Sequence, residues 1–466
     1  MFDYTATYTD LYQITMSQVY FHKGLQDETA VFDYFFRKLP FGGGYAVFAG
    51  LEDLIETIET FHFDEKDLQF LQAQGMDKAF VDYLKDFHFR GNIYASREGD
   101  LIFPNRPVLR VEAPIIETQL LETLVLNILN YQSLVATKAS RMRFAAGDRK
   151  LVDFGLRRAP GTGGYSAARA AFIGGFDATS NVRAGRDYGI PVSGTMAHSF
   201  IQCYDNELEA FRDFAAVHPQ NCVLLVDTYD TLKSGVPNAI RVGKEMQERG
   251  EQLKGIRLDS GDLAYLAKES RKMLDDYGLK DVKIAASNQL DEHVIKSLNE
   301  QQAPIDLFGV GTSLVTGMPD AALDGVYKLS TVNDKSRIKL SESIDKITLP
   351  GKKQVYRLLN EDGSWVGAEA VALENEGDFT TMHHPFVYGK SMNVEKFRRE
   401  KLLHKVMENG NRVAGKQSLE EISVYRRERL QQLSGEFKRF ENPHIYKIGI
   451  SSGLKDLRNR LKENKL

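Results

Sequence analysis

Five short apolar runs, each ending in small, polar or charged residues, most strongly limit what this chain can fold into. They cover residues 151–155, 223–227, 255–259, 283–288 and 307–311, and segments with helical character follow them. Buried parallel strands carry continuous apolar runs of this kind, with functional residues at their carboxyl ends. The pattern predicts an α/β domain and favours a TIM-barrel-like α/β barrel over a sandwich, although an open, doubly wound sheet would give the same pattern.

The segments before these runs follow a different pattern. Residues 1–115 combine a helix near 9–24, a strand at 29–36 and a helix near 50–60 without strand–helix alternation. Apolar residues then recur at helical spacing from Glu117 to Ala146, as expected for a long helix between domains. We therefore expect an N-terminal α+β domain at 1–116, an α/β barrel at 117–370, and a C-terminal region at 371–466 that packs on the other two.

Charge and cysteine content exclude several kinds of protein. From about residue 395 onward charges of both signs are dense, which is typical of a solvated helical face, so we expect a helical, charged C-terminal extension. The whole chain has 60 basic and 64 acidic residues, a formal net charge of −4, which argues against bulk binding to nucleic acid or to a membrane. We also expect a cytoplasmic protein. The sequence has two isolated cysteines, no signal-peptide pattern and no apolar segment long enough to span a membrane.

Two of the apolar runs end in residues suited to an anionic ligand. Gly309, Gly311 and Thr312 form a turn in which backbone amides could approach a phosphate, although a tight strand-to-helix turn would look the same. Arg257 and Asp259 are two residues apart on a strand and therefore point to the same side. They could hold a phosphate and sugar hydroxyls, or they could form an internal ion pair.

Three further segments carry chemically useful side chains. Phe154 could stack on a flat ring and Arg157 could bind a carboxylate or phosphate, the alternative being a core phenylalanine beside surface arginines. His198 lies among small residues, where an imidazole could serve as nucleophile or general base. Asp227 could orient a sugar hydroxyl or bind Mg²⁺ through water, or it could cap a helix. No set of residues has the spacing of a protein-ligated metal site.

Taken together, these segments resemble nicotinate phosphoribosyltransferases. Further matching segments occur in the family's order over nearly the whole chain: residues 9–13 (TDLYQ), 36–38 (FRK) with the glycines at 42–44, 48–52 (FAGLE), 178–182 (ATSNV) and 442–444 (NPH). The resemblance implies the type II phosphoribosyltransferase fold, an irregular α/β barrel with an N-terminal α+β domain, assembled as a homodimer with shared active sites.

The resemblance also implies a reaction. Nicotinate and phosphoribosyl pyrophosphate would give nicotinate mononucleotide and pyrophosphate in NAD salvage. ATP would be the co-substrate, acting through a phosphohistidine at His198, and Mg²⁺ would accompany the phosphates. The alternatives are a phosphoribosyltransferase for nicotinamide or quinolinate, and a non-catalytic protein that binds pyridine nucleotides.

The resemblance assigns roles to particular side chains. The residues implied in catalysis are His198, Arg257 and Asp259. Those implied in nicotinate binding are Tyr12, which would reach the neighbouring subunit's site, and Phe154, Arg157, Ser180, Thr195 and Arg257. Those implied in phosphoribosyl pyrophosphate binding are Arg157, Asp227, Asp259, Asn288, Gly309, Gly311 and Thr312. Related nicotinamide enzymes carry an aspartate at the position of Ser180, and such a carboxylate would repel a nicotinate anion, so Ser180 favours the acid.

Overall fold

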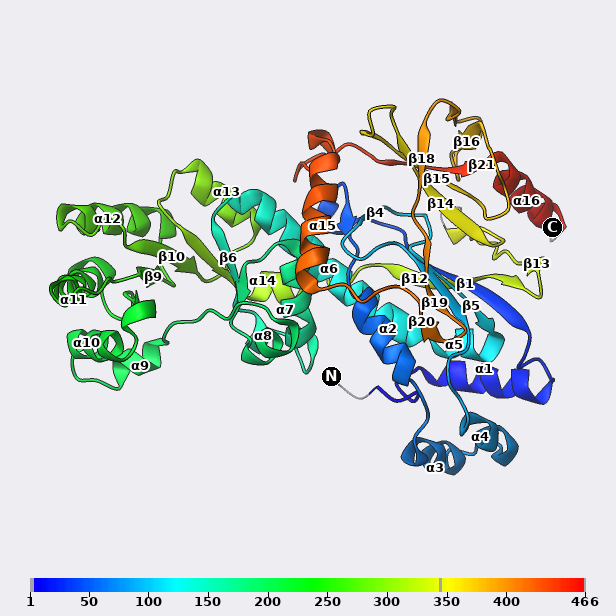
Figure 1. Ribbon diagram of the computed structural model, residues 1–466, viewed down its shortest axis with the longest axis horizontal. Helices are drawn as coiled ribbons and strands as arrows, with labels where there is room; N and C mark the ends of the chain where they lie inside the picture. Colours follow the sequence, from blue (N-terminus) through cyan, green and yellow to red (C-terminus); the bar gives the residue numbers. More distant parts are fainter. Residues whose placement is uncertain (1–3, 343–345, 465–466) are drawn as a thin grey trace. The chain divides into compact units, whose positions relative to one another are not determined.

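The chain folds into two compact units in the computed structural model, which describes residues 4–342 and 346–464 (Figure 1). The first unit comprises 1–137 and 322–466, and the second comprises 138–321. Helix α6 (Glu122–Ala146) carries the chain from the first unit into the second. The division into three parts at residues 116 and 370 stays a prediction.

The second unit is built on a six-stranded sheet in which every strand pair is parallel. The strand order is β7–β6–β11–β10–β9–β8. The strands are β6 (Lys150–Asp153), β7 (Ala178–Thr179), β8 (Val223–Leu225), β9 (Gly255–Leu258), β10 (Lys283–Ser287) and β11 (Leu307–Val310). The five predicted apolar runs are five of these strands, which confirms a mixed α/β fold with a parallel sheet.

Helices connect these parallel strands (Figure 1). They are α7 (Gly163–Gly174), α8 (Val182–Tyr188), α9 (His198–Gln202), α10 (Glu207–Val217), α11 (Val236–Glu248), α12 (Leu263–Asp276), α13 (Glu292–Glu300) and α14 (Thr312–Val315), with short turns of helix at Leu156–Arg158, Pro219–Asn221 and Thr231–Gly235. Each crossover returns the chain to the same edge of the sheet, so the carboxyl ends of the strands lie together.

The predicted irregular barrel is not confirmed: within the described residues the parallel sheet does not close, because its edge strands β7 and β8 do not pair. The chain between them forms α8, α9 and α10, and it pairs with β7 through an isolated parallel bridge between Thr179 and Val192. Pro191 precedes that bridge and has no N–H to donate to a ladder, and Gly194 follows it, so this segment is a poor strand. The sheet therefore stays open.

In its described residues the first unit contains three sheets. An antiparallel seven-stranded sheet has the order β13–β12–β1–β5–β3–β19–β20, with bounds β13 (Lys335–Ser336), β12 (Gly325–Val332), β1 (Thr29–Phe36), β5 (Leu109–Pro114), β3 (Asn92–Ala95), β19 (His404–Glu408) and β20 (Asn411–Arg412). A six-stranded sheet has the order β17–β16–β21–β15–β14–β18, with bounds β17 (Ser391–Asn393), β16 (Thr381–His383), β21 (Lys447–Ser451), β15 (Trp365–Leu373), β14 (Lys353–Leu359) and β18 (Arg398–Lys401). Strands β2 (Ala46–Val47) and β4 (Leu101–Ile102) form the third.

Helices complete the first unit. They are α1 (Leu11–His22), α2 (Leu51–Thr60), α3 (Glu65–Ala73), α4 (Lys78–Leu84), α5 (Ile115–Leu120), α15 (Leu419–Gln432) and α16 (Ser452–Glu463), with short turns at Pro40–Gly42 and Gly435–Phe437. No helix within the described ranges has the length and apolar character needed to span a membrane.

The expectation of a helical, charged C-terminal extension is wrong in part. Residues beyond 395 supply β18 to one sheet of the first unit and β19 and β20 to another. Arg429, counted in the sequence as part of a solvated charged face, is a buried residue on α15. The dense charges are therefore partly interior, and their partners come from distant parts of the chain.

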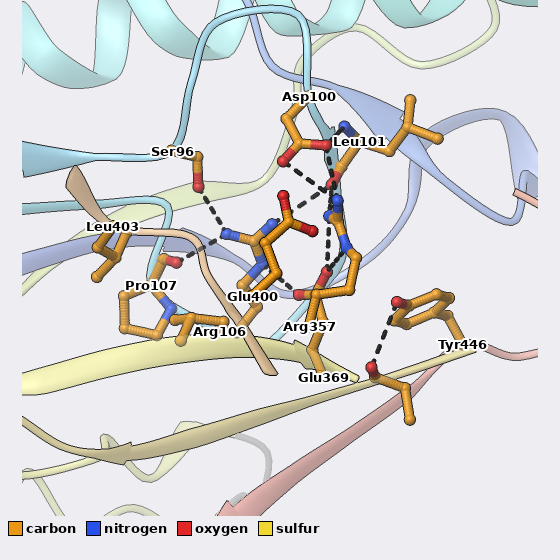
Figure 2. Close-up of polar contacts among 12 residues, drawn as sticks. Ser96, Asp100, Leu101, Arg106, Pro107, Arg357, Glu369, Glu400, Leu403 and Tyr446 are labelled. Carbon is orange, nitrogen blue, oxygen red and sulfur yellow. Dashed lines mark hydrogen bonds and ion pairs between the residues drawn. The ribbon is translucent and has the colours of Figure 1, made fainter. Parts of the chain in front are cut away.

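A buried ionic network explains how these charges are accommodated. The Arg357 guanidinium donates to Asp100 and to Glu369 at 2.9 and 2.8 Å. Arg106 lies 2.9 Å from Glu369, and Arg429 donates to Asp100 at 3.0 Å. Figure 2 shows the guanidinium groups of Arg106 and Arg357 beside these two carboxylates. Each carboxylate thus lies between two arginines, which compensates charges that would otherwise be very costly to bury.

Candidate active site

Polar side chains from three neighbouring strands gather at the carboxyl edge of the parallel sheet. Arg257 lies in β9, Asp259 directly follows it, and Ser287 ends β10. Asp227 follows β8, and His198 is the first residue of α9. All five side chains are linked directly or through one another by the contacts described next.

Arg257 is at the centre of this group. Its Nε donates to Ser287 Oγ at 2.9 Å and its Nη2 to Asp259 Oδ1 at 2.9 Å. Its Nη1 donates to Thr195 Oγ1 at 3.2 Å and to the Met196 carbonyl at 3.3 Å. The side chain is only 15% exposed. These contacts hold a positive charge in one fixed orientation, which a planar guanidinium does better than an ammonium group.

Asp259 connects the arginine to the rest of the site. The Ser287 hydroxyl donates to its carboxylate. Burial alone would raise the pKa of Asp259, but the hydrogen bonds from Ser287 and Arg257 lower that pKa below its usual range. Asp259 is therefore an ionised carboxylate at neutral pH.

Asp227 adds a second carboxylate. Its Oδ2 accepts the Asp259 backbone N–H at 2.8 Å and the Ser260 hydroxyl at 2.6 Å. Its Oδ1 is buried and has no hydrogen-bond partner among the described residues. A buried carboxylate oxygen without a partner is costly unless a ligand completes it.

His198 lies beside Asp259 and Thr228 at two of these strand ends. Its Nε2 is 3.9 Å from Asp259 Oδ2, and its Nδ1 is 3.1 Å from Thr228 Oγ1. The side chain is 38% exposed, so a ligand in solution can reach the ring. An accessible imidazole beside an ionised carboxylate is an arrangement suited to nucleophilic or proton-transfer chemistry.

An aromatic ring lies beside the charged group. Phe154 directly follows β6, and the Arg257 guanidinium carbon is 5.4 Å from the centre of its ring. The ring also lies against Gly309, where an added Cβ would be 2.3 Å from a ring carbon. In this structure Gly309 is therefore required for the position of Phe154, a role that the sequence did not indicate.

The remaining predicted residues of the second unit also lie at the carboxyl ends of strands. Ser180 directly follows β7, and its N–H donates to the Asp153 carbonyl at 2.8 Å. Arg157 is exposed in the short helical turn after β6. Asn288 follows β10 with a φ of +82°, and Thr312 is the first residue of α14. Gly311 precedes α14, and a Cβ there would be 3.3 Å from the Phe154 carbonyl oxygen.

Tyr12 belongs to the other compact unit. It lies on α1, is 48% exposed, and its hydroxyl accepts a hydrogen bond from Gln13 at 3.2 Å. Burial of part of the ring raises the pKa of the Tyr12 phenol above its usual value. Its predicted role in a partner's site stays a prediction.

Three residues that the sequence did not single out make contacts in or beside this group. Ser287 bonds both Arg257 and Asp259, Thr228 bonds His198, and Asp153 bonds the turns that carry Phe154 and Ser180. Each lies at the carboxyl end of a predicted strand. Attention to every polar residue at those ends, rather than to charged ones and glycines, would have found them.

A cavity of about 270 Å³ adjoins the charged group. Phe154, Thr195, Arg257 and Ser287 are among its lining residues, and Val223, Ala285 and Leu307 supply apolar surface. The site thus combines a fixed cation, two carboxylates, an accessible imidazole and an aromatic ring beside a cavity. This combination is typical of an α/β enzyme site that binds a small, anionic substrate with a flat ring.

Comparison with known proteins agrees with this class. Sequence models of the nicotinate phosphoribosyltransferase N-terminal domain, family and C-terminal domain match residues 7–130, 149–362 and 352–458. Nicotinate phosphoribosyltransferase of Bacillus subtilis is 46% identical over 459 residues, covering 96% of this chain and 93% of the relative. Nicotinate phosphoribosyltransferase 1 of Arabidopsis thaliana is 38% identical over 522 residues, covering 97% and 93%.

Two solved structures are also similar to this chain. The crystal structure of human nicotinic acid phosphoribosyltransferase has a TM-score of 0.87 and 32% identity, covering 97% of this chain and 99% of that one. Nicotinate-nucleotide pyrophosphorylase from Pyrococcus furiosus has a TM-score of 0.72 and 25% identity, covering 92% and 95%. The chain belongs to the nicotinate phosphoribosyltransferase family. It is an enzyme that forms a C–N glycosidic bond, and its activity belongs to NAD biosynthesis.

Proposed function

We propose that this enzyme transfers the phosphoribosyl group of phosphoribosyl pyrophosphate to nicotinate, and that ATP hydrolysis drives the transfer through a phosphohistidine at His198. The products are nicotinate mononucleotide, pyrophosphate, ADP and phosphate. The observation that carries the proposal is the linked set Arg257–Asp259–His198, a fixed cation and an ionised carboxylate beside an accessible imidazole.

The charged set suits displacement at the anomeric carbon of the ribose. Positive charge develops on the sugar as pyrophosphate leaves, so holding the reactants in line and binding the phosphates are the main tasks of the protein. Arg257 and Arg157 supply positive charge toward nicotinate and the phosphates. Asp259 supplies negative charge near the sugar and orients the His198 ring.

The nicotinate ring is assigned to the pocket beside Phe154. Phe154 stacks on one face of the ring, and the partner subunit's Tyr12 stacks on the other face in a homodimer with shared sites. Ser180 and Thr195 donate hydrogen bonds near the carboxylate of the base. An uncharged side chain at position 180 favours the acid over the amide, because a carboxylate there would repel the nicotinate anion.

The phosphoribosyl pyrophosphate is assigned to the ends of β8, β10 and β11. Gly311 and Thr312, with Gly309 behind them, lie against the 5′-phosphate, and Asn288 binds a ribose hydroxyl. The unpartnered Oδ1 of Asp227 is suited to a ribose hydroxyl or to Mg²⁺. No group of three or more metal-ligating side chains exists among the residues that the structure describes, so Mg²⁺ is expected to be held mainly by substrate phosphates.

Product analysis tests the reaction. The enzyme is incubated with phosphoribosyl pyrophosphate and Mg²⁺, with or without ATP, and with nicotinate, nicotinamide or quinolinate as the base. We expect nicotinate mononucleotide, formed faster with ATP. Equal rates for nicotinate and nicotinamide would contradict the role of Ser180, and binding of the base without turnover would favour a non-catalytic binding protein.

Labelled ATP tests the phosphohistidine. We expect wild-type enzyme to incorporate acid-labile phosphate from γ-labelled ATP and His198→Ala to incorporate none. His218→Ala is the matched control, because His218 directly follows α10 in the same unit and packs against Phe214 rather than against Asp259. Acid-labile label in His198→Ala would refute the assignment.

Subunit mixing tests the shared site. Tyr12→Ala and His198→Ala subunits are mixed, and activity is compared with that of each variant alone. Regained activity is expected if Tyr12 serves the partner's site, and purely additive activity would show that Tyr12 serves its own chain.

The cytoplasmic location stays a prediction.

A further inference from the structure

Asp153 is a fully buried carboxylate at the carboxyl end of β6. Its Oδ1 accepts the Gly155 backbone N–H at 2.7 Å, and its Oδ2 accepts the Thr179 hydroxyl at 2.8 Å. Asp153 and Thr179 are register partners in the parallel β6–β7 pair, so their side chains lie on the same face of the sheet. One carboxylate thus joins two adjacent strand ends.

The two strand ends carry residues assigned to the base. Phe154 lies between Asp153 and Gly155, so the bond to Oδ1 closes a tight turn around it. Ser180 follows Thr179, and its N–H donates to the Asp153 carbonyl at 2.8 Å. The Asn181 N–H donates to Thr179 Oγ1 at 3.0 Å, which leaves the hydroxyl proton of Thr179 for Asp153. The turn at 179–181 is therefore bonded to Asp153 through both Thr179 and Ser180.

No cation compensates this carboxylate within the ranges that the structure describes, since its contacts are the amide and the hydroxyl. Burial raises the pKa of Asp153 above its usual range, although both hydrogen bonds oppose that shift. A buried carboxyl group without a counter-ion costs stability. The two hydrogen bonds of Asp153 tie together two strand ends that lie beside the site.

We propose that Asp153 is a positioning residue of the base-binding pocket, whose buried carboxylate fixes the spacing between Phe154 and Ser180. This inference rests on the proposed assignment of those two residues to nicotinate. Because Phe154 contacts a face of the base and Ser180 its carboxylate, a change in their spacing alters both the affinity for the base and the preference for acid over amide.

Substitutions at Thr179 test the proposal without touching the pocket itself. Thr179→Val keeps the shape of the side chain but removes the hydroxyl that donates to Asp153, whereas Thr179→Ser keeps that hydroxyl. Asp153→Asn removes the charge at nearly constant volume. Asp177→Asn is the matched control, because Asp177 accepts the Leu151 backbone N–H at 2.8 Å at the opposite end of the same strand pair.

The measurements are KM for nicotinate, KM for phosphoribosyl pyrophosphate, and the ratio of kcat/KM for nicotinate and nicotinamide. For Thr179→Val and Asp153→Asn we expect KM for nicotinate to rise on the order of tenfold and the acid-to-amide ratio to fall, with a much smaller change for phosphoribosyl pyrophosphate. Thr179→Ser and Asp177→Asn should keep wild-type values of both quantities. A purely structural role would lower the thermal midpoint and the active fraction without changing KM or the ratio.

Unchanged KM and ratio in folded Thr179→Val overturn the proposal, and this variant decides the question even if Asp153→Asn fails to fold. Phe154→Leu and Ser180→Asp, measured in parallel, separate the two levels of inference. If both leave KM for nicotinate unchanged, the proposed pocket is wrong and the role of Asp153 falls with it. If they raise KM and Thr179→Val does not, the pocket stands and only the positioning role is refuted.

Discussion

Substitution of Gly309 by alanine is the sharpest test of how the aromatic side of the site is built. A Cβ at this position would lie 2.3 Å from Cε2 and 2.5 Å from Cδ2 of the Phe154 ring. Ordinary contacts begin at 3.4 Å, so the ring has to retreat by about 1 Å. The Arg257 guanidinium carbon is 5.4 Å from the centre of the same ring, and this guanidinium is fixed by bonds to Thr195, Asp259 and Ser287.

The expected effects follow from this geometry. Overpacking of a well-filled interior lowers the free energy of unfolding by about 1–3 kcal/mol. A shift of about 1 Å in a substrate-positioning ring is expected to reduce kcat/KM for nicotinate by a factor on the order of 10 to 100. The assay is steady-state kinetics with varied nicotinate at saturating phosphoribosyl pyrophosphate, together with urea unfolding.

Two further variants make the result interpretable. Gly377→Ala is the control, because a Cβ there has no neighbour within 4 Å and its φ is not in the left-handed region. In Gly309→Ala/Phe154→Leu the smaller side chain should relieve the clash and recover stability but not nicotinate affinity, which a double-mutant cycle would record. Wild-type kinetics and stability in Gly309→Ala would refute the placement of the ring.

Three other measurements address the body of the protein. Arg357→Met should lower the free energy of unfolding in urea by about 3–5 kcal/mol, because it leaves buried carboxylates short of a partner, and unchanged stability would contradict this. Burial alone would raise the pKa of Asp100, but Arg357 and Arg429 lower it below its usual value. Asp100 therefore contributes stability that is present above its unfolded-state pKa and is lost as the pH falls through its folded-state pKa. Urea unfolding at a series of acid pH values measures this loss, and Asp100→Asn should make the free energy of unfolding less dependent on pH. Burial, with a smaller contribution from Glu251, raises the pKa of the Cys222 thiol to about 12. Iodoacetamide should therefore alkylate the exposed Cys203 in the native enzyme and leave Cys222 unmodified, which mass spectrometry would detect.

The sequence predicted the parts of the fold that rest on local pattern. Apolar runs identified five of the six strands of the parallel sheet, and the run at 29–36 matches β1 at both ends. Arg257 and Asp259 were expected on one side of a strand, and they form an ion pair at 2.9 Å. Parallel strands present their carboxyl ends at one edge of a sheet, and accordingly the Asp227 carboxylate at the end of β8 accepts the Asp259 N–H at the end of β9.

Features that depend on distant partners could not be predicted in this way. Strand β7 has two residues, too few to give a pattern of its own. Gly309 carries no sign in the sequence that its neighbour is the Phe154 ring, since the two residues lie on different strand ends. Arg429 and Arg357 are counted as surface residues until their carboxylate partners are known, because charged side chains are rarely buried without them. The assignment of Ser180 came from the family resemblance rather than from pattern.

The open edge of the parallel sheet affects how the site is held, because Arg257 bonds the segment that crosses this edge. In a closed barrel the segment around residues 192–197 would be fixed by ladder hydrogen bonds to both neighbouring strands. Here it has a single bridge at Val192, and its next fixed points are the bonds from Arg257 to Thr195 Oγ1 and to the Met196 carbonyl. His198 follows two residues later and is oriented by Thr228 and Asp259. The guanidinium that presents positive charge to a substrate therefore also replaces missing ladder bonds in the segment that carries the histidine. The two contacts of Arg257 Nη1 are longer than the roughly 2.7–2.9 Å that is typical of hydrogen bonds from a charged donor. They are therefore the weakest of the hydrogen bonds that Arg257 makes in the site.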